Sequence, residues 1–335
     1  MGPLSNRSSE THEGAVIMNI VVAGGTGFIG QYLTQVLVEE GHRVTVLSRC
    51  PEKASLPSSS NFCALKWNGR TVEDWAKRCE GTDAVINLTG APIADSRWTR
   101  KRKHVLIESR VESTRTLLQA IQSWNPKPHT FLSASGIGFY GDRQAEVVDE
   151  SSTTGHGFLP QLCQAWEGAA HQGEAMGLRV IVMRIGMVLE SDGGALSKMT
   201  IPFRFFLGGP ILPGTQFVSW IHREDLVRLI LFALTHSAIR GPVNAVAPES
   251  VTMQDFCAAL GKAIKRPSWC PVPRFALNIA LGELSTLLTT GQRVYPRKAL
   301  LEGFAFAYPT LQRAFQAIWR HSPSPLMNKA HTERI

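Results

Sequence analysis

Paired cysteines are missing from this sequence. Its six cysteines are scattered, and no two of them form a C-x-x-C motif. They also stand in otherwise apolar or helical segments, which fits neither a metal site nor a disulfide framework. We therefore expect no metal and a reducing compartment. The cysteines are Cys50, Cys63, Cys79, Cys163, Cys257 and Cys270.

Long apolar runs, internal repeats and a secretory signal are missing as well. No stretch of roughly 20 apolar residues is free of charge, as a membrane span would be. Residues 1–16 are polar and serine-rich and have no apolar core, which is unlike a signal peptide. We expect a cytoplasmic protein without a membrane partner, with a disordered tail at 1–17 and a second tail at 321–335.

Positive charge is in excess. The formal net charge of +8 favours phosphate-bearing ligands or polyanionic partners. The basic residues are spread along the chain, except for a run formed by Arg97 and residues 100–103. Such a run is usually the solvated face of a helix, and binding of nucleic acid is the less favoured alternative.

The strongest positive signal is the segment Val21–Gly30. Its apolar, β-branched start predicts a buried strand, and its glycines predict a turn that leads into a helix. At such a turn, backbone N–H groups and the helix dipole hold a pyrophosphate. The segment therefore indicates a dinucleotide cofactor.

The end of the next predicted strand, at 43–47, indicates which dinucleotide is bound. An NAD-binding fold carries an acidic residue about 20 residues beyond the glycine turn, where it contacts the ribose hydroxyls. This chain has Ser48 and Arg49 instead. Because an arginine can pair with a 2′-phosphate, the sequence favours NADP(H), with a plain surface arginine as the alternative.

Strands and helices alternate as far as residue 184, which predicts an α/β fold: a Rossmann-like doubly wound parallel sheet with a smaller, mainly helical C-terminal region. Repeated glycines and prolines predict a loop-rich lid or pocket wall at 191–214. The expected division is an NADP(H)-binding Rossmann domain at 18–190, with 217–248 returning to its sheet, and a smaller substrate or lid region at 191–216 and 249–320.

Several landmarks follow one another in a fixed order over residues 18–225: Gly24-x-x-Gly27-x-x-Gly30, Asn87–Gly90, Ser133–Ser135 before Phe139–Gly141, Arg184, and Trp220–Asp225. In this order they resemble the extended short-chain dehydrogenase/reductase superfamily. Further segments resemble its atypical, epimerase-like family 39U, whose members have also been called SulA-like: Arg97-Trp98, Ser109-Arg110, Leu162–Glu167, Gly208–Pro210 and Gly291–Arg297. The resemblance implies a Rossmann fold, bound NADP(H) and a small C-terminal domain of unknown function.

The resemblance also implies roles for single residues. It assigns Ser48 and Arg49 to the 2′-phosphate, Arg110 to the ribose or a phosphate, and Val188 to the nicotinamide pocket. It assigns the following residues to the pyrophosphate or the adjoining cofactor surface: Gly24, Gly25, Thr26, Gly27, Phe28, Ile29, Gly30, Leu88 and Thr89.

Two further cofactor contacts are expected from the residues themselves. Gly90 follows a predicted strand and lets the backbone approach a ligand, although a tight turn would also use a glycine. Ser133 carries a hydroxyl near the carboxyl edge of the parallel sheet, where ligands bind.

Catalysis is where the chain departs from the superfamily pattern. Extended members use a Tyr-x-x-x-Lys helix, in which the lysine lowers the pKa of the tyrosine that exchanges a proton with the substrate. Here Leu159 aligns with the tyrosine and Cys163 with the lysine. Neither side chain can do that work.

Other residues are weaker candidates for the chemistry. Ser135 aligns with the catalytic serine of the superfamily, but a structural strand-end serine is equally compatible. Tyr140 is a candidate substitute acid, against a packed or substrate-lining tyrosine, and His156 is a loop histidine that is normally just exposed. His222 and Asp225 are expected to cap and fasten the helix that follows them.

The leading interpretation is an NADP(H)-binding, epimerase- or reductase-like protein that lacks the usual dyad. Its expected partner is a small-molecule substrate, either a sugar nucleotide or a carbonyl compound. A non-catalytic NADPH-binding regulator or scaffold is the alternative. A homodimer through the predicted helices at 99–123 and 159–176 is a further expectation.

Overall fold

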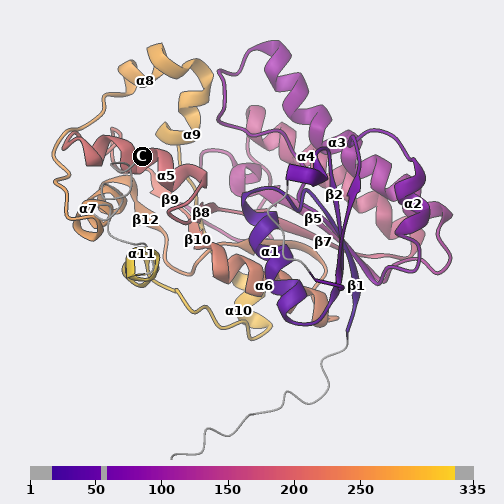
Figure 1. Cartoon of the computed structure of the whole chain (residues 1–335). Coiled ribbons are helices and arrows are strands. Elements are labelled where there is room, and N and C mark those ends of the chain that lie inside the picture. The colour runs from indigo at the N-terminus through magenta and orange to yellow at the C-terminus, as the bar shows by residue number, and fades with distance from the viewer. Residues whose placement is uncertain (1–16, 54–58, 321–335) are drawn as a thin grey trace, which may run out of the picture.

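A seven-stranded parallel sheet organises the molecule (Figure 1). The computed structural model describes residues 17–53 and 59–320, so the two expected tails, residue 17 apart, lie outside the described residues. All neighbouring strands run parallel in the order β11-β7-β5-β4-β1-β2-β3, which confirms the predicted Rossmann-like fold. The strands are β1 Asn19–Ala23, β2 Arg43–Ser48, β3 Phe62–Lys66, β4 Ala84–Asn87, β5 Thr130–Gly136, β7 Arg179–Ile185 and β11 Gly241–Ala245.

Alternation along each strand sends apolar side chains to both faces of the sheet, so helices must cover both. In β1, Ile20 and Val22 join the core under α1 (Phe28–Glu39) and α6 (Arg223–Thr235). Val21 and Ala23 join the core on the opposite face. That face is covered by α2 Asp74–Arg78, α3 Arg100–Ser123 and α4 Phe158–His171. Each fully buried aliphatic side chain contributes about 1.5–3 kcal/mol, and the two cores hold the layers together.

A smaller, mainly helical region lies beside the sheet and has its own core, as expected (Figure 1). Its centre is formed by Phe203, Trp220, Phe256 and Phe315. The helices after α4, apart from α6, are α5 Gly194–Arg204, α7 Met253–Ala263, α8 Arg274–Leu281, α9 Thr286–Thr289, α10 Arg297–Leu301 and α11 Leu311–Arg320. Of these, α10 packs on β11 and joins the core of the main sheet through Ala299. Short strand pairs join the parts: β6 Val147–Val148 with β13 Arg293–Val294, β8 Met187–Leu189 with β10 Trp220–His222, and β9 Phe217–Val218 with β12 Val251–Thr252. The short 3₁₀ helices are η1 Pro51–Lys53, η2 Ile137–Tyr140, η3 Gln172–Met176 and η4 Gly282–Ser285.

The structure corrects three expectations. The loop-rich segment at 191–214 contains the helix α5, because Leu196, Thr200 and Phe203 recur at helical spacing and are buried. Within 217–248, β11 joins the main sheet, whereas β9 and β10 pair with strands outside it. The long helix expected over 159–176 ends at His171 and continues as the 3₁₀ helix η3. None of the helices in the described residues is long and apolar enough to cross a membrane.

Two residues fasten the start of α6 as predicted. His222 is the N-cap, and its Nδ1 accepts a hydrogen bond from the backbone N–H of Glu224 at 3.2 Å. The fully buried carboxylate of Asp225 accepts backbone N–H groups from Ala307 at 2.9 Å and Tyr308 at 2.8 Å. The His222 ring also lies against the Tyr308 ring, with centroids 3.9 Å apart. These contacts tie α6 to the chain just before α11.

The buried imidazole of His222 makes stability depend on pH. Burial lowers the pKa of His222 to about 4, despite the opposing effect of Glu224 and Asp225, whereas an exposed histidine titrates near 6.5. Between those values the unfolded chain binds more protons than the folded chain. The His222 contribution therefore falls by up to about 3 kcal/mol as the pH drops from about 6.5 to about 4.

We expect His222→Gln to reduce the loss of unfolding free energy between pH 7 and pH 4.5, measured by urea denaturation. His104→Gln is the matched control, because the His104 side chain is exposed. The same pH dependence in the wild type and His222→Gln would contradict the prediction.

Candidate functional site

The glycine turn between β1 and α1 is packed so closely that several of its glycines leave no room for a side chain. Gly24 has φ of +82°, and a Cβ atom there would lie 3.0 Å from the carbonyl carbon of Leu88. A Cβ atom at Gly30 would lie 2.3 Å from the carbonyl oxygen of Gly24. Gly27 is the N-cap of α1, and no side chain caps this helix end. The first turn of α1 therefore presents free backbone N–H groups, which suits a pyrophosphate.

The end of β2 lies beside this turn. The N–H of Gly24 donates to the carbonyl of Leu47 at 3.1 Å, and the hydroxyls of Thr26 and Ser48 are 3.2 Å apart. Arg49 is exposed and makes no hydrogen bond or ion pair with another described residue. Its guanidinium is free to pair with an anionic group bound next to the turn.

The segment after β4 is fixed by a hydroxyl and amide network. The Asn87 Oδ1 atom accepts the backbone N–H of Thr89 at 3.1 Å, and the Asn87 amide donates to Thr114 at 2.8 Å. The hydroxyls of Thr89 and Ser113 are 2.6 Å apart. This network holds Leu88–Gly90 between the glycine turn and α3.

Arg110, on α3, is a buried cation without a carboxylate partner among the described residues. Its side chain donates one hydrogen bond, from Nη1 to the carbonyl of Leu106 at 3.0 Å, and its Cζ lies 5.1 Å from the Trp166 ring centroid. Its Nε atom is buried without a hydrogen-bond partner. Burial lowers the pKa of Arg110 to about 10. A Cβ atom at Gly90 would lie 2.9 Å from the Arg110 Cζ, so a larger residue there would displace the guanidinium.

A second buried arginine, Arg184, has a full set of partners. Its Nε and Nη2 atoms donate to the two carboxylate oxygens of Glu167 at 2.9 and 2.8 Å. Ser135 donates its hydroxyl to Glu167 Oε1 at 2.7 Å. Arg184 Nη1 also donates to the Tyr140 hydroxyl at 3.0 Å, and this hydroxyl donates to Asn244 at 2.7 Å.

The surroundings of Tyr140 do not suit a role as the acid that replaces the tyrosine of the dyad. Its side chain is fully buried, its hydroxyl is held by Arg184 and Asn244, and it does not line the cavity described below. Burial raises the pKa of Tyr140 to about 12, although Arg184 lowers it in part. The geometry therefore favours the packed alternative, and we assign Tyr140 no proton transfer.

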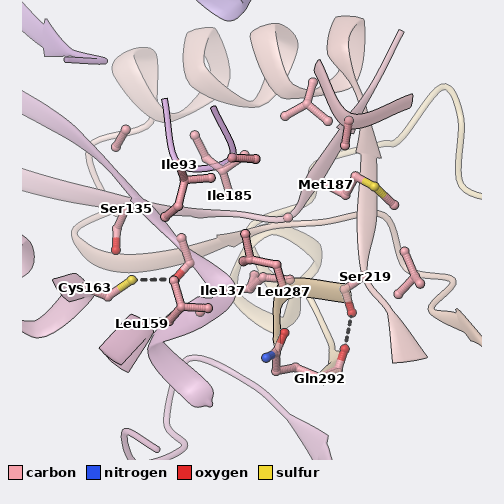
Figure 2. A pocket seen from close by; sticks show the side chains of 18 of the residues that line it. Ile93, Ser135, Ile137, Leu159, Cys163, Ile185, Met187, Ser219, Leu287 and Gln292 are labelled. Atoms are coloured by element: carbon pink, nitrogen blue, oxygen red, sulfur yellow. Dashed lines mark hydrogen bonds between the residues drawn. The ribbon is translucent and has the colours of Figure 1, made fainter. Parts of the chain in front are cut away.

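A cavity of about 500 Å³ lies at the carboxyl edge of the sheet (Figure 2). Ile29 from α1, Leu88 after β4, Arg110 from α3, Ser135 from β5 and Val188 from β8 all line it. It thus brings together predicted residues from five segments. Ser133 is fully buried and donates to the Ala134 carbonyl at 3.2 Å, and neither Ser133 nor the exposed His156 lines the cavity.

The two positions aligned with the Tyr-x-x-x-Lys dyad also face this cavity. Leu159 and Cys163 lie one turn apart on α4, and both line the wall (Figure 2). The Cys163 thiol lies 3.5 Å from the carbonyl oxygen of Gly136. Burial raises the pKa of Cys163 to about 11, so the thiol is neutral at pH 7. All six cysteines are free.

The segment predicted as a lid or pocket wall lines the cavity with Ala195, Met199 and Phe217. Sequence reasoning did not single out the remaining wall residues, which come from segments that lie far apart in the chain: Met187, Ser219, Met253, Leu287, Leu288, Thr290 and Gln292. Gln292 belongs to one of the motifs that carry the family resemblance, but nothing in that motif indicated a side chain in the site.

Most of the basic residues in the run at 97–103 form hydrogen bonds or ion pairs with other residues of the chain. Arg97 donates to the carbonyls of Ile279 and Ala280, Arg102 donates to the carbonyl of Pro92, and Lys103 pairs with Glu283. Nucleic-acid binding through this run would have to compete with these contacts.

Comparisons with known proteins give a consistent match. The model of the NAD dependent epimerase/dehydratase family matches residues 20–245, and a model of a domain of unknown function, DUF1731, matches residues 272–318. The chain is 39% identical over 304 residues to the epimerase family protein YfhF of Bacillus subtilis (strain 168), covering 90% of this chain and 98% of that one. It is 39% identical over 306 residues to the chloroplastic SDR39U1 homolog of Arabidopsis thaliana, covering 90% and 86%.

A solved structure extends the match to three dimensions. The crystal structure of human epimerase family protein SDR39U1 (isoform 2) with NADPH superposes with a TM-score of 0.81 at 33% identity, covering 91% of this chain and 100% of that one. These matches confirm the resemblance to the 39U branch that the motifs indicated.

The missing partner of Arg110 leads to a stability prediction. A buried cation without a counter-charge destabilises a fold. We expect Arg110→Met to raise the Tm of the ligand-free protein, by about 2 °C if the gain is about 1 kcal/mol. Differential scanning fluorimetry measures this, with Arg115→Met as the control, because Arg115 is an exposed residue of the same helix that pairs with Glu112. A lower Tm in Arg110→Met than in Arg115→Met would contradict the prediction.

Proposed function

The chain belongs to the NAD dependent epimerase/dehydratase family, and we propose that it is an NADP(H)-binding epimerase- or reductase-like protein without the usual Tyr-x-x-x-Lys dyad. The observation that carries the proposal is the shared cavity. Ile29, next to the glycine turn, and Ser135, at the end of β5, line the same cavity. A dinucleotide on the turn would therefore present its reactive end to the wall that contains Ser135.

NADP(H) fits the residues present. Gly24 and Gly30 leave no room for side chains in the turn, and Arg49, which has no partner among the described residues, follows β2 next to that turn and would pair with a 2′-phosphate. The human relative crystallised with NADPH supports the same cofactor. When bound, NADP(H) would supply or accept a hydride at the nicotinamide ring.

Proton handling would differ from that of relatives with the dyad. Neither Leu159 nor the neutral Cys163 thiol provides an acid and a cation in the cavity. Ser135 lines the cavity and already donates its proton to Glu167, so its oxygen is left to accept a hydrogen bond from a substrate hydroxyl. A proton taken up at Ser135 Oγ could pass to the Glu167 carboxylate, which Arg184 holds in place.

A non-catalytic NADPH-binding regulator or scaffold is the second candidate. The apolar and thiol side chains at the two dyad positions favour it. Steady-state oxidation of NADPH with sugar-nucleotide, quinone and small carbonyl panels distinguishes the two, with Ser135→Ala as the control for catalysis. Bound NADPH that is never oxidised would favour the regulator.

A homodimer through α3 and α4 stays a prediction. Light scattering on the purified protein would measure the oligomeric state.

The cofactor assignment predicts a charge-reversal effect. We expect Arg49→Glu to weaken NADPH binding by about 100-fold, because a charge-assisted pair with the 2′-phosphate is replaced by repulsion. NADH, which lacks this phosphate, should bind with nearly unchanged affinity. Nucleotide fluorescence titrations measure both constants.

Arg43→Glu is the matched control for that prediction, since Arg43 is an exposed residue at the opposite end of β2. An equal loss of NADH and NADPH affinity in Arg49→Glu would count against a 2′-phosphate contact.

A further inference from the structure

The cavity wall is unusually poor in polar groups for a sugar-binding site. Among its lining residues, all in the described part of the chain, Arg110 is the one charged side chain, and there is no carboxylate, histidine, lysine or tyrosine. Besides the Cys163 thiol and the indole N–H of Trp166, which is buried without a hydrogen-bond partner, the other polar side chains are Ser135, Ser219, Thr290 and Gln292. Leucines, isoleucines, methionines and a phenylalanine supply most of the rest.

Several of these polar groups are already engaged. Ser135 donates to Glu167. Ser219 donates to the backbone carbonyl of Gln292 at 2.7 Å (Figure 2) and accepts the backbone N–H of Val294 at 2.9 Å. The Gln292 side-chain amide makes no hydrogen bond with a described residue, and the Arg110 Nε is unpaired. Few polar positions are therefore left for a substrate.

We propose that this cavity takes a mainly apolar carbonyl compound, such as a quinone or an enone, and not a sugar nucleotide. The inference rests on the proposed function, because it concerns the substrate of the same site. Each hydroxyl of a sugar and each charge of a diphosphate loses water on entering a cavity and needs a partner there. This wall cannot supply them, whereas it matches an apolar ring with one or two polar atoms.

Exposed apolar side chains also follow the wall residues along the chain. α5 contributes Ala195 and Met199 to the wall and carries Ile201, which is 51% exposed, while Phe205, the residue after α5, is 71% exposed. α8, which packs on η4 just ahead of the wall residue Leu287, has no buried residue, although its sequence RFALNIAL is mostly apolar.

The test compares two probes on the full-length protein with NADP⁺ bound, so that no hydride is available. Isothermal titration calorimetry with menadione (2-methyl-1,4-naphthoquinone) and with UDP-glucose gives both affinities. We expect menadione to bind at least about 10-fold more tightly, a difference of about 1.4 kcal/mol. Tighter binding of UDP-glucose, or no menadione binding to NADP⁺-loaded protein, would overturn the inference.

Variants locate the binding. Leu287→Asn places an amide in the wall and should weaken menadione binding about 10-fold. The matched control Leu301→Asn, on a side chain that is 77% exposed, should leave it unchanged. Met199→Gln tests the α5 side of the wall if Leu287→Asn does not fold. Unchanged menadione affinity in the folded wall variants would also overturn the inference.

An error in the cofactor assignment would give different binding results from an error in the inferred substrate class. If the wild type does not bind NADP⁺ but binds menadione in a way that Leu287→Asn or Met199→Gln weakens, the proposed function falls and the inference about the cavity stands. If NADP⁺ binds and UDP-glucose is the preferred probe, the proposed function stands and the inference falls.

Discussion

Arg184 and Glu167 form an ion pair that is almost completely buried behind the cavity, and the arrangement of the site depends on it. Removing two charges from water is costly, and such a pair is tolerated only when geometry and further hydrogen bonds compensate for the lost hydration. Here both carboxylate oxygens accept from the guanidinium, and Ser135 and Tyr140 occupy further positions. The pair thereby fixes β5, α4 and β7 relative to one another and sets the direction in which the Ser135 hydroxyl donates.

The two buried arginines illustrate different uses of the same side chain. Arg184 has partners for its charge and belongs to the framework. The guanidinium of Arg110 contacts one backbone carbonyl and one tryptophan ring. Burying it without a counter-charge therefore destabilises the ligand-free protein. Natural proteins retain such destabilising residues where binding of a ligand or function requires them. The contrast separates the framework of the site, to which Arg184 on β7 belongs, from Arg110 on α3, whose charge lacks a partner among the described residues.

Local pattern was enough to predict the glycine turn and the cofactor, whereas the residues that contact the cofactor stay predictions and most of the opposite wall was not predicted. The glycine turn and the end of β2 lie close together in sequence. The apolar pattern of the two strands and the spacing of the glycines are typical of a strand, a tight turn and a helix that begins at the turn. The opposite wall is assembled from Met199, Met253, Leu287 and Gln292, which only the tertiary fold brings together. The environment of Tyr140 could not be predicted from local sequence either, because its hydroxyl is hydrogen-bonded to Asn244 in a strand that is distant in sequence. The helix α5 was missed because glycine and proline suggested loops, while burial of Leu196 and Phe203 decided the outcome.

The side chains at the two positions of α4 that align with the dyad contribute to the apolar character of the cavity. A tyrosine and a lysine on α4 would each need hydrogen-bond partners in this wall, and the lysine would need a counter-charge or access to water. With Leu159 and Cys163 in those positions, neighbouring residues such as Leu162 and Leu284 pack in one apolar cluster on that side of α4. The side chains of Leu159 and Cys163 and the apolar wall thus belong to the same part of α4. The hydrogen bond between Ser135 and Glu167 lies next to this wall, because Glu167 is on α4 one turn after Cys163.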